Sequence, residues 1–193
     1  MTQQEIHNNS EVQAQFNAGT VDGDVYFSPK TRFAKRFEKL NHEVANNIRY
    51  NEIMDSLKNY LTKLDGTKDM PEKLKDGNFN ENEIIRAIRR KENYAKKLER
   101  NRFFESAQWI DSQLFAKIKI EFEAHIEPLI NNGASKDEIV KEVAVKVVNP
   151  VLELINSEGE NDEYLSYNAE DIFGMIYYLT GQCHINWKNY DSI

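Results

Sequence analysis

The sequence lacks the features of a secreted or membrane-spanning protein. It contains one cysteine, Cys183, which excludes an internal disulfide framework and a cysteine-rich zinc site. No apolar run approaches the roughly 20 residues that a membrane-spanning helix needs. The first five residues have neither the basic nor the apolar region of a secretory signal. We therefore expect a cytoplasmic protein without membrane spans, in a reducing compartment that suits its single thiol.

Glycine and proline are also scarce, with 8 and 4 residues among 193, so few positions interrupt regular structure. Hydrophobic residues make up 40 % of the chain and charged residues 30 %, and the mean hydropathy is −0.70. This balance is typical of amphipathic helices that each have one solvated face. The composition therefore predicts an all-α protein, a helical bundle long enough to bury a core. The net charge of −7 argues mildly against a chain that coats DNA.

Residues 1–30 differ from the rest of the chain. Apolar and polar residues alternate near residues 12–16 and 25–27, with the turn-forming pair Asp22-Gly23 between them. The pattern predicts a short β-hairpin-like segment, and an isolated hairpin is marginal in water. It would therefore pair with another copy, a partner or the body of the chain. Four apolar residues would mediate this oligomerisation: Phe16, Val25, Tyr26 and Phe27. A flexible polar terminus is the alternative.

Residues 31–193 have a helical period and are predicted to form one helical domain. Apolar residues from Phe33 to Leu64 recur mostly every three or four positions, which predicts one long amphipathic helix ending near Asp65-Gly66. Its near-heptad pattern suits pairing with another helix, within the domain or between chains. The charged stretch 66–78 that follows is interpreted as a loop.

Helix-start signals divide the rest of this domain. Four polar residues are predicted to begin helices: Asn80, Ser106, Ser135 and Asn168. Three of them stand three residues before an acidic residue, as in a capping box. Asn149-Pro150 is expected to break one helix, and Gly181 to end the last one. Gly174 lies inside that last helix, where glycine costs helix propensity, so we expect close packing against another helix there.

The sequence contains no recognisable catalytic, metal or cofactor motif. The four histidines, at positions 7, 42, 125 and 184, are far apart and lack zinc-ligand spacing. His125 is interpreted as a hydrogen-bonded core residue. There is no nucleophile elbow, and the glycines form no phosphate-binding loop. We therefore expect no metal, no cofactor and no enzymatic activity, although a small enzyme whose site only the fold assembles is a further alternative.

The strongest local anomaly is a basic stretch over residues 86–102, in which only Glu92 and Glu99 are acidic. It contains eight cationic residues: Arg86, Arg89, Arg90, Lys91, Lys96, Lys97, Arg100 and Arg102. Three aromatic residues accompany it: Tyr94, Phe103 and Phe104. Such a stretch can dock on an acidic protein surface or contact nucleic-acid phosphates. A solvated helix face without a partner is the third interpretation.

Three blocks of sequence are more specific than these general signals. The first covers residues 90–98, 101–103 and 106–108, and the second covers residues 125–130 and 133–135. The third, and most distinctive, is DIFGMIYYLTGQCHI at residues 171–185, followed by Trp187. In this order the blocks resemble the C-terminal domain of bacterial ABC-three component conflict systems, over roughly residues 40–187.

The resemblance implies a helical adaptor that docks on other members of a multi-component system. Such systems combine an SMC-like ABC ATPase, a middle component and an effector, and are thought to act against phages and other invasive DNA. The C-terminal domain is usually attached to an effector, often a nuclease or peptidase. Here only about 30 residues precede the helical region, so we expect any catalytic part to lie on another polypeptide.

These observations predict a non-enzymatic adaptor subunit of a bacterial anti-phage defence complex, which docks to the ABC ATPase or the effector and could self-assemble through its N-terminal segment. The alternative is a nucleic-acid-binding accessory protein that uses residues 86–102. Eight residues are candidates for partner binding: Arg86, Arg89, Arg90, Lys96, Lys97, Tyr178, His184 and Trp187. The turn and tail after the last helix could equally be a packing cap.

Overall fold

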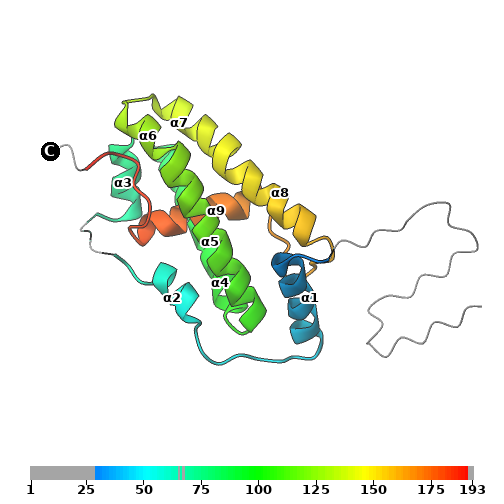
Figure 1. Ribbon diagram of the computed structural model, residues 1–193. Coiled ribbons are helices and arrows are strands. Elements are labelled where there is room, and N and C mark those ends of the chain that lie inside the picture. The colour runs from blue at the N-terminus through cyan, green and yellow to red at the C-terminus, as the bar shows by residue number, and fades with distance from the viewer. Residues whose placement is uncertain (1–28, 65, 67, 191–193) are drawn as a thin grey trace, which may run out of the picture.

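The computed structural model describes residues 29–64, 66 and 68–190, and these residues form helices without any strand (Figure 1). The expected all-α fold is therefore confirmed for this part of the chain. The helices, with the π-helical turn η1, are α1 (Arg32–Ala45), α2 (Asp55–Leu61), α3 (Met70–Asp76), α4 (Glu81–Asn101), α5 (Glu105–His125), α6 (Glu127–Asn131), α7 (Lys136–Glu142), η1 (Val143–Val148), α8 (Asn149–Glu158) and α9 (Ala169–Gly181).

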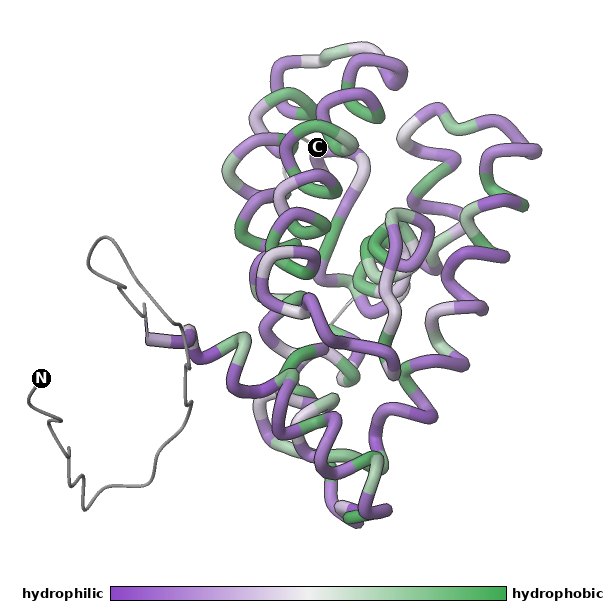
Figure 2. Tube along the Cα trace, turned by 90° about the vertical axis from the view of Figure 1, so that its right-hand side faces the viewer, coloured by the Kyte–Doolittle hydropathy of each residue, from purple (hydrophilic) through white to green (hydrophobic). Residues whose placement is uncertain are grey.

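Helix α5 forms the centre of the bundle. It contacts α1, α2, α4, α6, η1, α8 and α9, and its side chains are buried around most of its circumference. Helix α9 is also buried along most of its length, whereas α1 and α4 are amphipathic, and hydrophobic and hydrophilic residues alternate along much of the chain (Figure 2). Five side chains of α5 are fully buried and anchor the core: Ile110, Leu114, Phe115, Ile118 and Phe122. No helix within the described ranges is long and apolar enough to cross a membrane.

The single long helix predicted over residues 33–64 is wrong, because the structure divides this stretch into α1 and α2. Asn47 has a φ of 50°, a left-handed conformation that asparagine adopts more readily than most residues. The Ile48 N–H donates to the Glu43 carbonyl over 2.8 Å, as in the Schellman motif that ends many helices. Residues 48–54 then contain no helix.

Helix α3 lies inside the stretch that the sequence analysis interpreted as a loop. Asp69 caps it, because the Asp69 side chain accepts a bond from the Glu72 N–H while the Glu72 carboxylate accepts one from the Asp69 N–H. Pro71 is in the first turn, where its missing N–H costs no intrahelical bond. The stretch predicted to be a loop therefore contains a capped helix whose first turn includes a proline.

The break predicted at Asn149-Pro150 is also wrong. Helices α7, η1 and α8 continue directly from one to the next, from Lys136 to Glu158 (Figure 1). The Asn149 N–H donates to the carbonyl of Ala144, five residues earlier, so the hydrogen-bond pattern is one residue wider than in an α-helix. This wider turn accommodates Pro150, which has no N–H to donate.

The predicted helix starts at Asn80, Ser135 and Asn168 are confirmed. The side chains of all three accept hydrogen bonds from backbone N–H groups in the first turn. The start at Ser106 is two residues late, because α5 has Phe104 at its N-cap, without a side-chain cap. Gly181 is the last residue of α9, but Cys183 takes the left-handed conformation after it, with a φ of 65°.

The hairpin-like segment at residues 1–30 falls almost wholly outside the described residues, so its oligomerisation residues Phe16, Val25, Tyr26 and Phe27 stay a prediction.

Candidate interaction surface on helix α4

Helix α4, which carries the basic stretch, is held by a capped start and a close contact with α9. Asn80 and Glu83 form a complete capping box at its first turn. Tyr94 and Ala87 are buried on its inner side. Gly174 of α9 lies directly against the α4 backbone at Arg90, which confirms the expected close packing. The outer side of α4 is therefore presented to solvent in a fixed orientation.

Two of the predicted partner-binding cations are paired with the start of α9. Arg90 makes two bonds to the Glu170 carboxylate, of 2.7 Å from Nε and 2.6 Å from Nη2, and this guanidinium lowers the pKa of the Glu170 carboxyl. Lys97 Nζ donates to Asp171 Oδ2 over 2.8 Å. Arg90 also lies over the Phe173 ring, 4.8 Å from its centroid. These cations hold α9 against α4 and are already satisfied within the chain.

Four other cations of α4 are exposed, and none of them forms an ion pair with another described residue. They are Arg86, Arg89, Lys96 and Arg100, and we call them the α4 surface. Their separations of three, seven and four residues place them on one side of the helix. The guanidinium of Arg100 is 5.1 Å from the centroid of the Tyr164 ring. The chain therefore presents a solvent-accessible stripe of four cations on this helix, flanked by the exposed Glu92 and Glu99.

The C-terminal end of α4 gains a cation that the sequence did not connect with it. The Tyr50 N–H donates to the Phe103 carbonyl over 2.9 Å, which brings the loop after α1 to this end. Arg49 and Arg102 then lie 5.2 and 5.6 Å from the centroid of the Phe103 ring, and Phe103 is 39 % exposed. Because 54 positions separate Arg49 from Phe103, no local sequence pattern could have revealed this contact.

The other aromatic residues of the basic stretch belong to the core. Tyr94 is buried and donates to Asp111 Oδ1 over 3.2 Å, and Tyr167 donates to the same oxygen over 2.5 Å. Asn101 donates to Asp111 Oδ2 over 3.0 Å. Burial nevertheless raises the pKa of Asp111 to about 6. Phe104 is also buried, so these groups organise the interior and are inaccessible to a partner.

The remaining candidates lie apart from the α4 surface. Trp187 is 3 % exposed, and its indole N–H donates to Thr180 Oγ1 over 3.0 Å, so the tail is a packing cap at this residue. Tyr178 is half-buried and stacks on Phe115, with ring centroids 5.8 Å apart. His184 is half-buried beside Tyr60, and burial lowers its pKa. These three residues form no joint site with the cations of α4.

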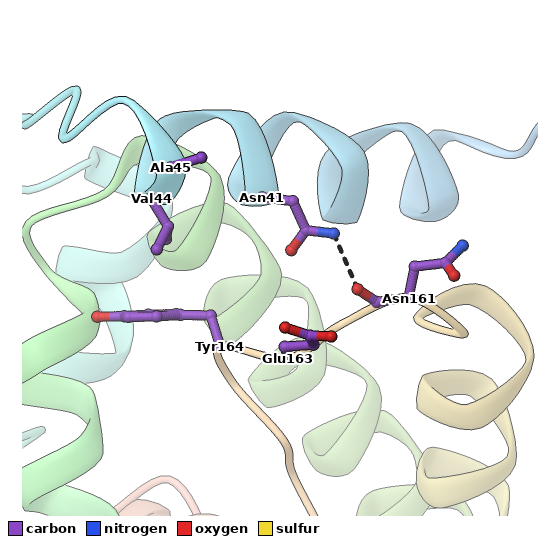
Figure 3. A pocket seen from close by; sticks show the side chains of 6 residues that line it. All are labelled: Asn41, Val44, Ala45, Asn161, Glu163 and Tyr164. Carbon is purple, nitrogen blue, oxygen red and sulfur yellow. Dashed lines mark hydrogen bonds between the residues drawn. The ribbon is translucent and has the colours of Figure 1, made fainter.

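No group of three or more potential metal ligands is present in the part of the chain that the structure describes. His125 is exposed on α5, 3.4 Å from Glu121, so its assignment to the core was wrong. A hollow of about 540 Å³ lies between α1 and the loop after α8 (Figure 3). Within its lining, Asn41 Nδ2 donates a hydrogen bond to the Asn161 carbonyl over 2.9 Å. The lining of this hollow has one carboxylate, Glu163, and no cation.

Comparison with known families identifies the domain. The model of C-terminal domain 9 of the ABC-three component (ABC-3C) systems, CTD9, matches residues 69–187. The chain belongs to this family. The match confirms the resemblance found in the sequence, although it begins at α3 rather than near residue 40. A search of curated proteins and a search of solved structures returned no match.

The CTD9 match has a clear structural meaning in this chain. It runs from the cap of α3 to the buried Trp187, and it includes α4, α5, α9 and the whole α4 surface. Helices α1 and α2 precede it and pack on α5. The described part of the chain therefore comprises a CTD9 domain preceded by helices α1 and α2.

Proposed function

We propose that this chain is a non-catalytic adaptor of an ABC-3C system, and that it docks through the α4 surface on an acidic surface of another component, the ABC ATPase or the effector. The observation that carries the proposal is the set of four exposed cations without ion pairs inside the CTD9 domain. Family membership supports a partner within the system, and the charge of the stripe supports an acidic docking site.

The cations of α4 fall into two groups, paired and unpaired, and this supports docking on a partner over the interpretation of a solvated helix face. Arg90 and Lys97 are bound to α9, so they hold α4 in position and are not used to bind a partner. Arg86 and Arg89 remain free on the same helix. Complementary charges at the edge of an interface mainly raise the association rate and set orientation, and they are sensitive to salt.

The test is capture of the proteins encoded beside this chain. The tagged full chain is expected to retain a neighbouring component through purification after nuclease treatment, which removes bridging nucleic acid. The variant R86E/R89E is expected to reduce this capture at least tenfold, because like charges then face the acidic partner. The matched control K141E/K146E changes the same charge at exposed helical positions of α7 and η1 and should leave capture unchanged.

Two results would contradict the proposal. One is a chain that captures no neighbouring component, and the other is R86E/R89E that captures as well as the control. Circular dichroism of both variants checks that the helices are intact. Self-assembly through residues 1–30 is a separate part of the proposal. Deleting residues 1–28 should lower the number of chains per particle in solution, and an unchanged oligomeric state would refute it.

A further inference from the structure

A second cationic surface lies between α1 and α5, away from the residues considered above. A hollow of about 440 Å³ is lined by five residues. Four of them are cations of α1 and the fifth is an indole of α5: Arg32, Lys35, Arg36, Lys39 and Trp109. We call this the α1 groove. Its lining contains no acidic residue, although the chain as a whole has a net charge of −7.

Helical spacing creates the cationic wall of the groove. The four cations are separated by three, one and three residues, which places them along one face of α1. The Arg36 guanidinium lies 5.3 Å from the centroid of the Trp109 ring. Phe33 supports the same ring with an edge contact, 5.3 Å between centroids. The indole is therefore held in place within the positively charged α1 groove, and it is only half-buried.

Part of this charge is not neutralised within the chain. Glu105, outside the lining, pairs with Lys39 over 2.5 Å and lies 3.6 Å from Arg36 Nη1. That nitrogen is buried and has no hydrogen-bond partner. Arg32 and Lys35 form no ion pair with any other described residue and are exposed. The groove thus retains two free cations, Arg32 and Lys35, whereas Arg36 and Lys39 are paired with Glu105.

Local helix stability does not explain these cations. The helix macrodipole favours acidic residues in the first turn and disfavours cations there. Helices α2, α3, α4, α5, α7 and α9, which also follow an extended N-cap residue, each have an acidic residue in the first turn. Helix α1 has none and begins with Arg32. Helix α1 therefore carries cations where the other helices carry acids, and the carboxylate at its start, Glu158, comes from α8 and bonds to Thr31.

We propose that the α1 groove binds single-stranded nucleic acid, with phosphates on Arg32 and Lys35 and a base stacked against Trp109. Cationic grooves with an aromatic platform are the usual means of holding single strands. An acidic peptide would use the cations but would leave the indole without a role. This activity goes beyond the adaptor function and does not depend on it, and it places nucleic-acid contact on α1 rather than on residues 86–102.

Tryptophan fluorescence of the full chain tests this directly. The chain has two tryptophans, and Trp187 is 3 % exposed with its N–H bonded internally. An oligothymidylate is expected to quench the emission of Trp109, and W109F is expected to abolish the quenching. Two phosphate contacts, on Arg32 and Lys35, predict a slope of log K against log salt of about −1.4 for a single strand.

Paired variants locate the site. R32E/K35E should weaken oligothymidylate binding at least tenfold and remove most of the salt slope, whereas R86E/R89E should bind like the unaltered chain. The proposal is overturned by an absence of binding, by loss of binding in R86E/R89E alone, or by quenching that persists in W109F. It is also overturned if polyglutamate or a DNA duplex binds as tightly as oligothymidylate. None of these outcomes affects the capture assay for the α4 surface.

Discussion

Gly174 of α9 lies so close to Arg90 of α4 that a Cβ at this glycine would be 2.7 Å from the Arg90 carbonyl oxygen. The same Cβ would lie 2.7 Å from the Cβ of Tyr94. Both obstacles belong to the backbone or its first side-chain atom, so neither can move away independently of the helix. The contact sets the distance between α4 and α9, and with it the position of the α4 surface.

We expect Gly174→Ala to lower the free energy of unfolding by about 2 kcal/mol or more, because overpacking forces the two helices apart. Gly181→Ala is the control in the same helix. Its Cβ would meet the flexible end of Lys91, at 3.4 Å, and the Met70 Cβ, at 3.9 Å, so its effect should stay within about 0.5 kcal/mol. Urea denaturation followed by circular dichroism measures both, and equal stability of the two variants would refute the packing argument.

Asp111 makes stability depend on pH in the direction opposite to most carboxylates. Its folded-state pKa is about 6, against an ordinary value of 3.8 for an aspartate, because burial disfavours the charged form. Between these values the folded chain binds more protons than the unfolded chain, so this contribution to the free energy of unfolding falls as pH rises. The loss amounts to about 3 kcal/mol across that range.

Asp111→Asn should remove this pH dependence. The Asn101 Oδ1 atom has no hydrogen-bond partner, so rotation of the Asn101 amide would let it accept from the new amide. The difference in stability between the unaltered chain and Asp111→Asn should therefore shift towards the variant between about pH 4 and pH 7. Parallel stability profiles for the two proteins over that range would contradict the assignment.

Glu43 of α1 caps α5 from outside that helix. Its carboxylate accepts bonds from the Ser106 N–H, over 3.0 Å, and from the Ser106 hydroxyl, over 2.9 Å. Glu43→Ala should cost about 2 kcal/mol, because both buried donors lose their acceptor. Glu38→Ala, at an exposed position of the same helix, should change stability by less than about 0.5 kcal/mol. Thermal unfolding of the two variants provides the comparison, and similar midpoints would disprove the capping role.

Short-range sequence signals predicted the helix starts that depend on neighbouring residues alone. Asn80 and Asn168 begin helices because their side chains and the acids three residues later satisfy each other's backbone groups. The Asn46-Asn47 turn was missed because asparagine is a weaker helix-end signal than glycine, and the apolar period continues past it. Helix α3 was not predicted because the stretch 66–78 is short, charged and contains Pro71, although the first turn of a helix tolerates proline.

The candidate surface was predictable only in part, for a physical reason. The charge run showed that α4 would be basic, but the acids that neutralise Arg90 and Lys97 lie about 75 to 80 positions away in the sequence. Which cations stay free depends on how α9 crosses α4. The α1 groove was missed entirely, because its indole comes from α5 and its cations come from α1.

Polar bonds join the segment before residue 69 to the CTD9 domain at several separate points. Gln108 accepts from the Met54 N–H and donates to the Glu52 carbonyl, and the Leu64 N–H donates to the Gln182 carbonyl. A fragment that began at residue 69, where the family match begins, would leave these polar groups without their hydrogen-bond partners. It would also expose the side of α5 on which α1 and α2 pack. A truncated chain that begins at residue 69 would therefore be prone to aggregation, and expression should start upstream of α1.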